Sequence, residues 1–272
     1  ITIDRDATDV EILIVGGGGA GGRNIGGGGG AGGVVYAVNH TMTAGTYNIV
    51  VGDGGVGEGL NMSANPWYAH GPGENGEDSY ITDADGNILA MNMGGVSQEL
   101  KGLGGGGGGS RNEDGVTKAG SDGGSGGGLS QPNDNSHSVT TSSSLQPNTY
   151  WNGNSYIQGG YGGTDRIVIA NQDHWGHGTG GGGLSGTIYY KSGYTNDEPH
   201  IKTNGQEGIS IPITSPPTIV AAGGAGAQYK HHDIHMTPNL NYGFGGLGED
   251  SNSGNGSVYI TSTVNHRLDG QD

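Results

Sequence analysis

The sequence predicts a mostly β and irregular fold with almost no α-helix, in which N-terminal β-hairpins cap a stack of polyglycine-II helices. Glycine contributes 64 of the 272 residues, more than three times its usual share of about 7%. Hydrophobic residues make up only 30% of the chain, too few for an ordinary apolar core in a protein of this length. No segment carries apolar residues at helical spacing over the length of a helix.

The N-terminal third carries the clearest strand signals, which are runs of β-branched and aromatic residues bounded by glycine or polar turns. The first run is 10–15, which ends abruptly at Gly16. Residues 34–38 and 46–51 form two more runs, separated by a polar turn region. We expect these two runs to pair with each other as a hairpin.

An Asp-Gly turn predicts a second hairpin. Residues 79–82 and 87–90 flank Asp83-Ala-Asp-Gly86, and Asp-Gly favours the tight turns that join antiparallel strands. Two further short strands are predicted, one at 167–170 and one at 257–261, because both are rich in β-branched residues.

Runs of glycine between these strands predict the second part of the fold. They span 16–19, 26–30, 104–109, 126–128 and 180–183. A polyproline-II helix has about three residues per turn and no internal hydrogen bonds, so its N–H and C=O groups point outward in three directions. Neighbouring helices without side chains can pack closely and pair these groups. Interior helices then require glycine throughout, and rim helices require it only on their inward face. The expected interior residues are Gly17, Gly18, Gly28, Gly29, Gly105, Gly106, Gly107, Gly108, Gly181 and Gly182.

Flexible, disordered linkers are the alternative explanation of the glycine runs, because ordering a glycine backbone has a large entropic cost. Two features favour order: the runs are polyglycine rather than mixed glycine and serine with dispersed charge, and strands bracket them. We therefore predict a β-rich part over 1–100. A polyglycine-II lattice with long loops and a closing C-terminal strand is predicted over 101–272, and the two parts form one continuous structural domain.

Charge and composition make several partners unexpected. The formal net charge is −16, from 26 acidic and 10 basic residues, and the basic residues are scattered. Grooves that track phosphates need clustered Lys and Arg, so nucleic acid is not expected as a partner. The longest apolar runs are far too short to span a bilayer, so membrane insertion is not expected either. The chain has no cysteine, and therefore neither a disulfide nor a thiolate metal site.

The order of strands and glycine runs resembles that of a known family. Residues 10–22, then 26–36 and 44–55, look like the opening of the glycine-rich domain of bacteriophage tail fibres, and 255–260 is similar to its closing strand. The resemblance implies a protein of the virion tail fibre or extracellular surface. It also implies polyglycine-II helices, loops that bind a host surface receptor or glycan, and contacts with other virion or fibre subunits, including copies of itself.

Aromatic and imidazole side chains in the glycine-poor stretches are the candidate receptor-binding residues. Aromatic faces beside amides and imidazoles suit sugar rings or a protein epitope, and Tyr and Trp carry much binding energy at interfaces. The alternative is that they cover the flanks of the lattice and supply apolar burial there. The candidates are Trp67, Tyr68, His70, Tyr150, Trp151, Tyr156, His174, Trp175, Tyr189, Tyr190, Tyr194, Tyr229, His231 and His232.

An enzymatic role is not expected. Gly17, Gly19 and Gly22 follow a strand with the spacing G-x-G-x-x-G of dinucleotide-binding proteins. That motif requires a helix directly after its last glycine, whereas 23–30 is too rich in glycine to form one. No catalytic triad or pair of carboxylates can be placed by spacing.

Metal or cofactor binding is also not expected, although calcium on so acidic a chain stays open without a specified site. Residues 245–250 match the start of a calcium-binding nonapeptide repeat, but in a single copy, which cannot build that coil. The paired aspartates of 83–86 are read as an ordinary turn. The histidine groups at 174–177 and 231–235 lack a helix that would place their imidazoles on one face, so we read them as exposed loop residues.

Two functions therefore follow from the sequence: a non-enzymatic tail-fibre or fibre-tip adhesin, and a self-assembling structural subunit of a fibre, decoration or surface coat. Ice binding is a remote third option, because it requires regular triplets with Thr or Ala in register, and the triplets here are irregular.

Overall fold

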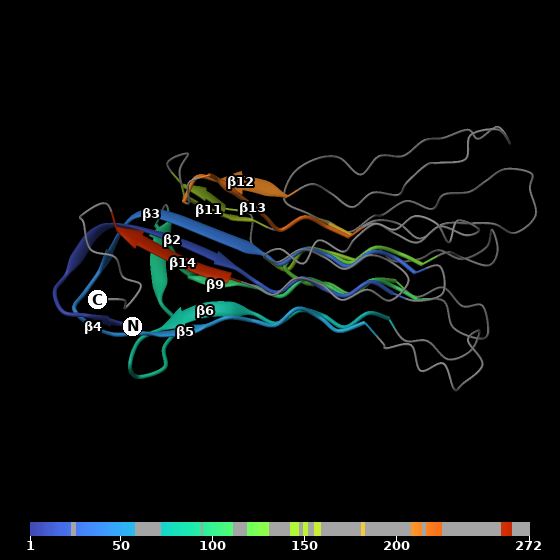
Figure 1. Cartoon of the computed structure of the whole chain (residues 1–272), viewed down its shortest axis with the longest axis horizontal. Coiled ribbons are helices and arrows are strands. Elements are labelled where there is room, and N and C mark those ends of the chain that lie inside the picture. Colours follow the sequence, from blue (N-terminus) through green and yellow to red (C-terminus); the bar gives the residue numbers. More distant parts are fainter. Residues whose placement is uncertain are drawn as a thin grey trace, which may run out of the picture.

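Strands gather at one end of the molecule, and glycine-rich segments run side by side from them toward the other end (Figure 1). The computed structural model describes residues 1–22, 26–57, 72–93, 95–110, 119–130, 142–146, 149–151, 155–158, 181–182, 208–213, 216–224 and 257–262. These residues form strands and irregular segments without any helix, which confirms the predicted fold class. A helix long and apolar enough to cross a membrane is accordingly absent from these ranges.

The largest sheet has five antiparallel strands and combines distant parts of the sequence. In spatial order they are β10 (Thr149–Trp151), β11 (Ser155–Gln158), β3 (Val34–Met42), β2 (Ala7–Val15) and β14 (Ser257–Ser262). The predicted strand at 257–261 is thus confirmed, and it pairs with β2 along its whole length. Strands and glycine segments both occur on each side of residue 100.

Smaller sheets surround this one. A three-stranded sheet has the order β5 (Asn48–Val50), β6 (Ser79–Thr82) and β9 (Lys101–Gly102). The two-stranded sheets are β1 (Thr2–Ile3) with β4 (Gly45–Thr46), β7 (Ala90–Met93) with β8 (Val96–Glu99), and β12 (Ile209–Ile211) with β13 (Thr218–Val220).

The first predicted hairpin is wrong, and of the second the turn forms, with a single bridge beyond it in place of a paired strand over 87–90. β3 pairs with β2 and β11, whereas the 46–51 run divides between β4, which pairs with β1, and β5, which pairs with β6. Residue composition predicted these strands but not which other strands they pair with. At the Asp-Gly turn, Thr82 bridges Ile88, and Asp83 donates its N–H to the carbonyl of Asn87 (2.9 Å). The predicted strand at 167–170 lies outside the described residues.

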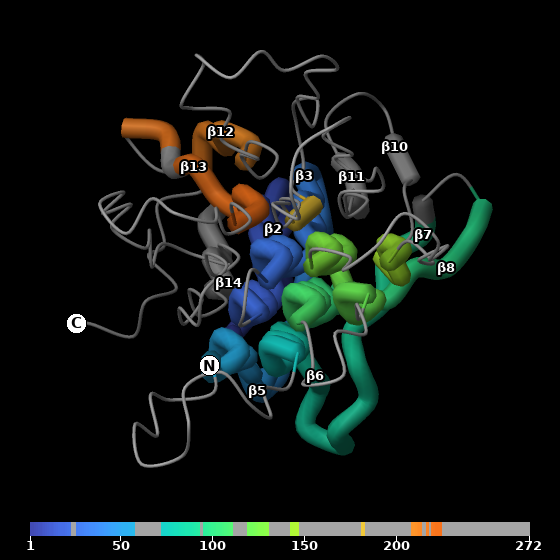
Figure 2. Tube along the Cα trace, turned by 90° about the vertical axis from the view of Figure 1, so that its right-hand side faces the viewer, coloured from blue at the N-terminus to red at the C-terminus, as the bar shows by residue number. Residues whose placement is uncertain are grey.

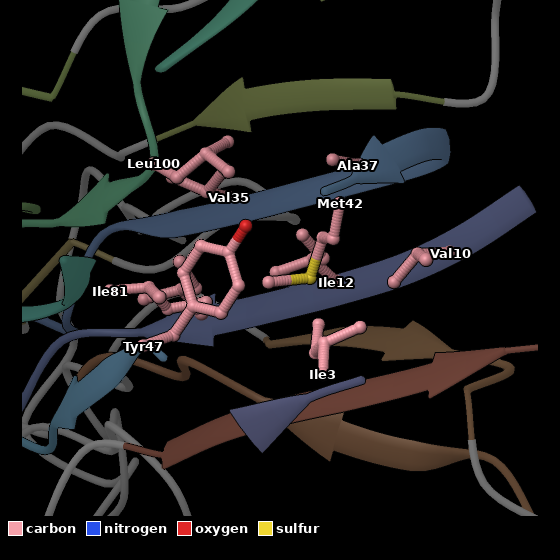
Figure 3. Packing of buried hydrophobic residues seen from close by; sticks show 10 residues of the cluster. Ile3, Val10, Ile12, Val35, Ala37, Met42, Tyr47, Ile81 and Leu100 are labelled. Atoms are coloured by element: carbon pink, nitrogen blue, oxygen red, sulfur yellow. The ribbon is translucent and has the colours of Figure 1, made fainter. Parts of the chain in front are cut away.

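Strands β2 and β3 are buried on both faces over 12–15 and 34–37 and contribute to two apolar clusters. Along β2, Val10, Ile12 and Ile14 belong to one cluster and Leu13 and Val15 to the other, as the alternation of a strand dictates. The first cluster is drawn in Figure 3 and consists of Ile3, Val10, Ile12, Ile14, Val35, Ala37, Met42, Tyr47, Ile81 and Leu100. The second consists of Leu13, Val15, Ala31, Val34, Tyr36, Ile211, Ile213, Val220 and Ala221. At the strand end, the expectation that the chain lacks an ordinary apolar core is therefore wrong.

Candidate functional site

The tract Gly104–Gly109 lies at the centre of the glycine-rich part, where every residue is buried. Each of its N–H groups donates a hydrogen bond, and each of its C=O groups accepts one, at separations of 2.6–2.9 Å. Seen end-on in Figure 2, the glycine-rich segments are compact coils packed side by side. A backbone without side chains thus satisfies its own polar groups by bonding sideways to neighbouring segments.

The partners of this tract repeat every third residue, as expected for a helix with about three residues per turn. The N–H groups of Gly105 and Gly108 donate to segment 16–22. Those of Gly106 and Gly109 donate to segment 125–130. Those of Gly104 and Gly107 donate to side chains of segment 72–78. The C=O groups of Gly105 and Gly108 accept from segment 72–78. Those of Gly106 and Gly109 accept from segment 26–33, and those of Gly104 and Gly107 accept from segment 119–124. We call this cross-bonded array the glycine lattice.

Close approach of backbones explains why the interior excludes side chains. A Cβ added to Gly106 would lie closer than 3.0 Å to the carbonyl of Ser121, a separation that real Cβ atoms essentially never show. The same holds for Gly105 against the carbonyl of Gly30. The structure places all the predicted interior glycines in described, buried segments of this lattice.

Segment 51–57 shows how a rim position differs. Gly52 and Gly55 are buried, whereas Asp53 and Val56 are exposed. A Cβ on Gly52 would meet the carbonyl of Glu77 closer than 3.0 Å. Glycine is therefore needed on the inward face, and the outward positions accept larger residues.

Segment 72–78 binds the central tract through both its backbone and its side chains. Gly73 and Gly76 donate their N–H groups to the tract (both 2.9 Å). The side-chain oxygens of Asn75 and Asp78 accept hydrogen bonds from it (both 2.8 Å). Two consecutive triplets, Gly-Glu-Asn and Gly-Glu-Asp, thus repeat one pattern of contacts.

Gln146 closes the lattice where it meets the strands. Its Oε1 accepts a hydrogen bond from the N–H of Leu103 (2.8 Å), and its Nε2 donates to the carbonyl of Lys101 (3.0 Å). The residue is only 4% exposed. A buried amide that both accepts and donates satisfies backbone groups which no glycine segment reaches.

The strands set the register of the lattice. Val15 of β2 is opposite Val34 of β3, and one residue further on Gly16 donates its N–H to the carbonyl of Gly33 (3.0 Å). The same pairing continues into segments 16–22 and 26–33, with bonds at every third residue. Each lattice segment that continues a strand therefore starts in a fixed position.

Several lattice segments end at the end of the lattice remote from the sheets, which we call the far end (Figure 1). Ser130 donates its hydroxyl to the carbonyl of Ser110 there (2.9 Å), and Gly22 donates its N–H to Gly27 (2.9 Å). The described chain stops at Gly22, Gly57, Ser110 and Ser130, and resumes at Gly26, Pro72, Ala119 and Ser142.

Three candidate binding residues lie at the strand end instead. Tyr150 and Trp151 belong to β10 and Tyr156 to β11, so they lie in paired strands rather than in the loop expected from the sequence. Tyr150 is opposite Tyr156, and Tyr156 is opposite Tyr36 of β3. The short run Ser155-Tyr-Ile-Gln158 was the available signal for this strand, and its length made it easy to miss.

The remaining aromatic and imidazole candidates lie outside the described residues. Trp67, Tyr68 and His70 belong to the stretch between Gly57 and Pro72, two residues of the far end. The other candidates outside the described residues are His174, Trp175, Tyr189, Tyr190, Tyr194, Tyr229, His231 and His232.

In the acidic turn at 83–86, the carboxylate of Asp83 accepts hydrogen bonds from the turn itself. Asp83 accepts hydrogen bonds from the N–H groups of Asp85 (3.0 Å) and Asn87 (2.8 Å) and from the side-chain amide of Asn87 (3.0 Å). These bonds, that of the Asn87 side chain above all, lower the pKa of Asp83. The turn therefore accounts for the carboxylate of Asp83. Within the described ranges, no group of three or more His, Asp or Glu is arranged to hold a metal ion.

The G-x-G-x-x-G spacing belongs to the lattice. Gly17, Gly19 and Gly22 all lie in the extended segment 16–22. A Cβ on Gly19 would meet the carbonyl of Gly106 closer than 3.0 Å, and one on Gly22 that of Gly109. These glycines allow another segment of the same chain to approach.

A small antiparallel β structure that continues into a cross-bonded glycine lattice defines the class: a glycine-rich domain. The chain belongs to the glycine-rich domain family, which matches it over residues 1–263. This match confirms the glycine-rich domain predicted from the sequence. No curated protein matches the chain by sequence.

Proposed function

We propose that the chain is a non-enzymatic domain of a bacteriophage tail fibre or fibre tip, which holds receptor-binding segments on a glycine lattice at the extracellular surface of the virion. The observation that carries this proposal is the convergence of chain exits at the far end. The exits at Gly22, Gly26, Gly57, Pro72 and Ser110 each end a lattice segment that continues directly into a strand, which fixes its register. The amino-acid sequence between these exits can therefore change without disturbing the glycine lattice.

The residues between the exits suit recognition. The stretch between Gly57 and Pro72 combines Trp67, Tyr68 and His70 with asparagines. Aromatic faces and amides bind sugar rings and protein epitopes well. A host surface glycan or receptor is the expected partner, and neither a metal nor a cofactor is needed for this role.

The experiment measures binding of the fluorescently labelled chain to a panel of bacterial cells and to an array of bacterial surface glycans. Two variants are compared: Trp67→Ala with Tyr68→Ala, at the far end, and Trp151→Ala, at the strand end. Loss of two aromatic anchors should weaken binding about tenfold or more. We expect the double variant to show this loss and Trp151→Ala to show a smaller one.

Thermal unfolding of each variant serves as the control for an intact fold. The proposal fails if neither cells nor glycans bind the unchanged chain. It also fails if binding survives replacement of the aromatic residues in every candidate stretch.

A self-assembling structural subunit is the second candidate, and the sheet borders favour it. β10 and β14 are the outer strands of the five-stranded sheet, and outer strands can pair between copies. Electron microscopy and sedimentation of the isolated chain distinguish the two functions. Filaments or large shells favour assembly, and small discrete species favour the adhesin.

A further inference from the structure

The outer strand β5 has one edge that the described part of the chain leaves uncovered. β5 pairs with β6 on one side, and no described strand borders it on the other. Just before β5, Tyr47 accepts a hydrogen bond from the amine of Ile1 (2.7 Å) and donates its N–H to the carbonyl of Ile1 (2.8 Å). The polar groups of Tyr47 therefore point to the uncovered side.

Ile49 presents its backbone to the same side. Backbone direction alternates along a strand, so Ile49, two residues after Tyr47, directs its N–H and C=O away from β6. Ile81 of β6 lies opposite Ile49, and its carbonyl accepts a hydrogen bond from the N–H of Leu89 (2.9 Å) instead of from β5. Ile49 and Ile81 therefore direct their backbone groups away from each other. The edge thus offers a donor and an acceptor to a further strand.

The side chains at this edge are apolar. Ile49 is 38% exposed and Val51 is 48% exposed, whereas Ile81, opposite Ile49, is fully buried in the first cluster. Proteins commonly protect outer strands with charge, proline or a covering segment, because a bare apolar edge pairs readily. A strand with an apolar residue opposite Ile49 would cover this side chain.

The register of β1 leads straight to this edge. Thr2 is opposite Thr46, and Ile3 is opposite Gly45. The bonds between Ile1 and Tyr47 continue the same antiparallel register. A residue joined in front of Ile1 would lie opposite Asn48, and the next one opposite Ile49.

We propose that the uncovered edge of β5 is a strand-docking site, and that its occupant is the polypeptide joined directly in front of Ile1 wherever this chain is part of a longer one. Such a segment continues β1 along β5 and attaches what precedes it to the sheet. A covalently joined segment is favoured over a separate one because its effective concentration is high and β1 already sets its register. This inference does not depend on the proposed function.

The test adds three residues in front of Ile1 of the full chain, as Thr-Val-Thr or as Thr-Pro-Thr, each released by the same tag cleavage. In both, the middle residue falls opposite Ile49. Valine can form the paired hydrogen bonds and cover the side chain, whereas proline has no N–H to donate. We expect the Thr-Val-Thr chain to exchange the amide proton of Ile49 about tenfold more slowly than the unextended chain, and to melt at a higher temperature than the Thr-Pro-Thr chain, which lacks the donor to the Ile49 carbonyl.

Equal exchange of the Ile49 amide in the Thr-Val-Thr chain and the unextended chain overturns the proposal, and so do equal melting temperatures of the two extended chains. Another result also overturns it, in favour of a second copy as occupant: protection of Ile49 in the unextended chain that increases with protein concentration and accompanies dimers in sedimentation.

Discussion

The side-chain oxygen of Asn75 accepts a hydrogen bond of 2.8 Å from the backbone N–H of Gly107. Three residues further on, Asp78 accepts one from Gly104, also at 2.8 Å, and its other oxygen pairs with Lys101 (2.7 Å). These side chains reach backbone donors of the central tract that no glycine segment satisfies. The lattice is therefore completed at its rim by short polar side chains at every third position.

Replacement of Asn75 by alanine should lower the free energy of unfolding by about 1–3 kcal/mol, because the N–H of Gly107 loses its partner in a partly buried place. Asn75→Asp keeps an acceptor oxygen and should cost less. Urea unfolding of both variants measures the difference. A larger loss for Asn75→Asp than for Asn75→Ala would contradict this role of the side chain.

Gly106→Ala should destabilise the protein by more than about 3 kcal/mol or prevent folding, since its Cβ would collide with the carbonyl of Ser121. Gly45→Ala is the matched control: its Cβ would meet only the ring of Tyr47, at 3.9 Å. Its effect should stay within about 1 kcal/mol. Thermal and urea unfolding measure both, and similar stabilities for the two variants would argue against close packing of the interior.

Ile12→Ala should cost about 2–5 kcal/mol, because this side chain is fully buried in the first apolar cluster. Val56, on the rim of the lattice, is 56% exposed, and Val56→Ala should change stability by no more than about 0.5 kcal/mol. The comparison tests whether the strand end depends on apolar burial. A small effect of Ile12→Ala would mean that it does not.

The free energy of unfolding should fall as the pH drops below 6.5, in part because of His40. Burial lowers the pKa of His40 from its ordinary value of 6.5. The unfolded chain then binds a proton at a higher pH than the folded chain, so acid favours unfolding between the two pKa values. His40→Gln should flatten the profile of stability against pH in this range. An unchanged profile would show that His40 does not contribute.

The sequence was sufficient for the fold class and for the strands with clear runs of β-branched residues, because both depend on local composition. Polyglycine runs have few ways to pair the N–H and C=O groups of their backbone. The β-branched runs at 10–15 and 34–38 clearly favour strands. Partner choice was not predictable in the same way. Residues 46–51 divide between two sheets because β1 and β6 offer them edges, and those edges come from distant parts of the chain.

The candidate site was less accessible to sequence reasoning. The sequence predicts a loop for Tyr150 and Tyr156, whereas pairing of Tyr150 with Tyr156, and of Tyr156 with Tyr36, places them in a sheet. The contacts of Asn75 had a usable signal, the repeated triplets of 73–78, in which glycine recurs at every third position. The role of Gln146 had none, because its contacts with Leu103 and Lys101 depend on tertiary packing alone.

Amide hydrogen exchange of Gly104–Gly109, followed by NMR, tests the central claim most directly, namely that side-chain-free backbone segments hold each other in place by sideways hydrogen bonds. We expect the amide protons of Gly105, Gly106, Gly108 and Gly109 to exchange only through global unfolding, with the same free energy as buried amides of β2. Exchange at the rates of an unstructured peptide would contradict the account.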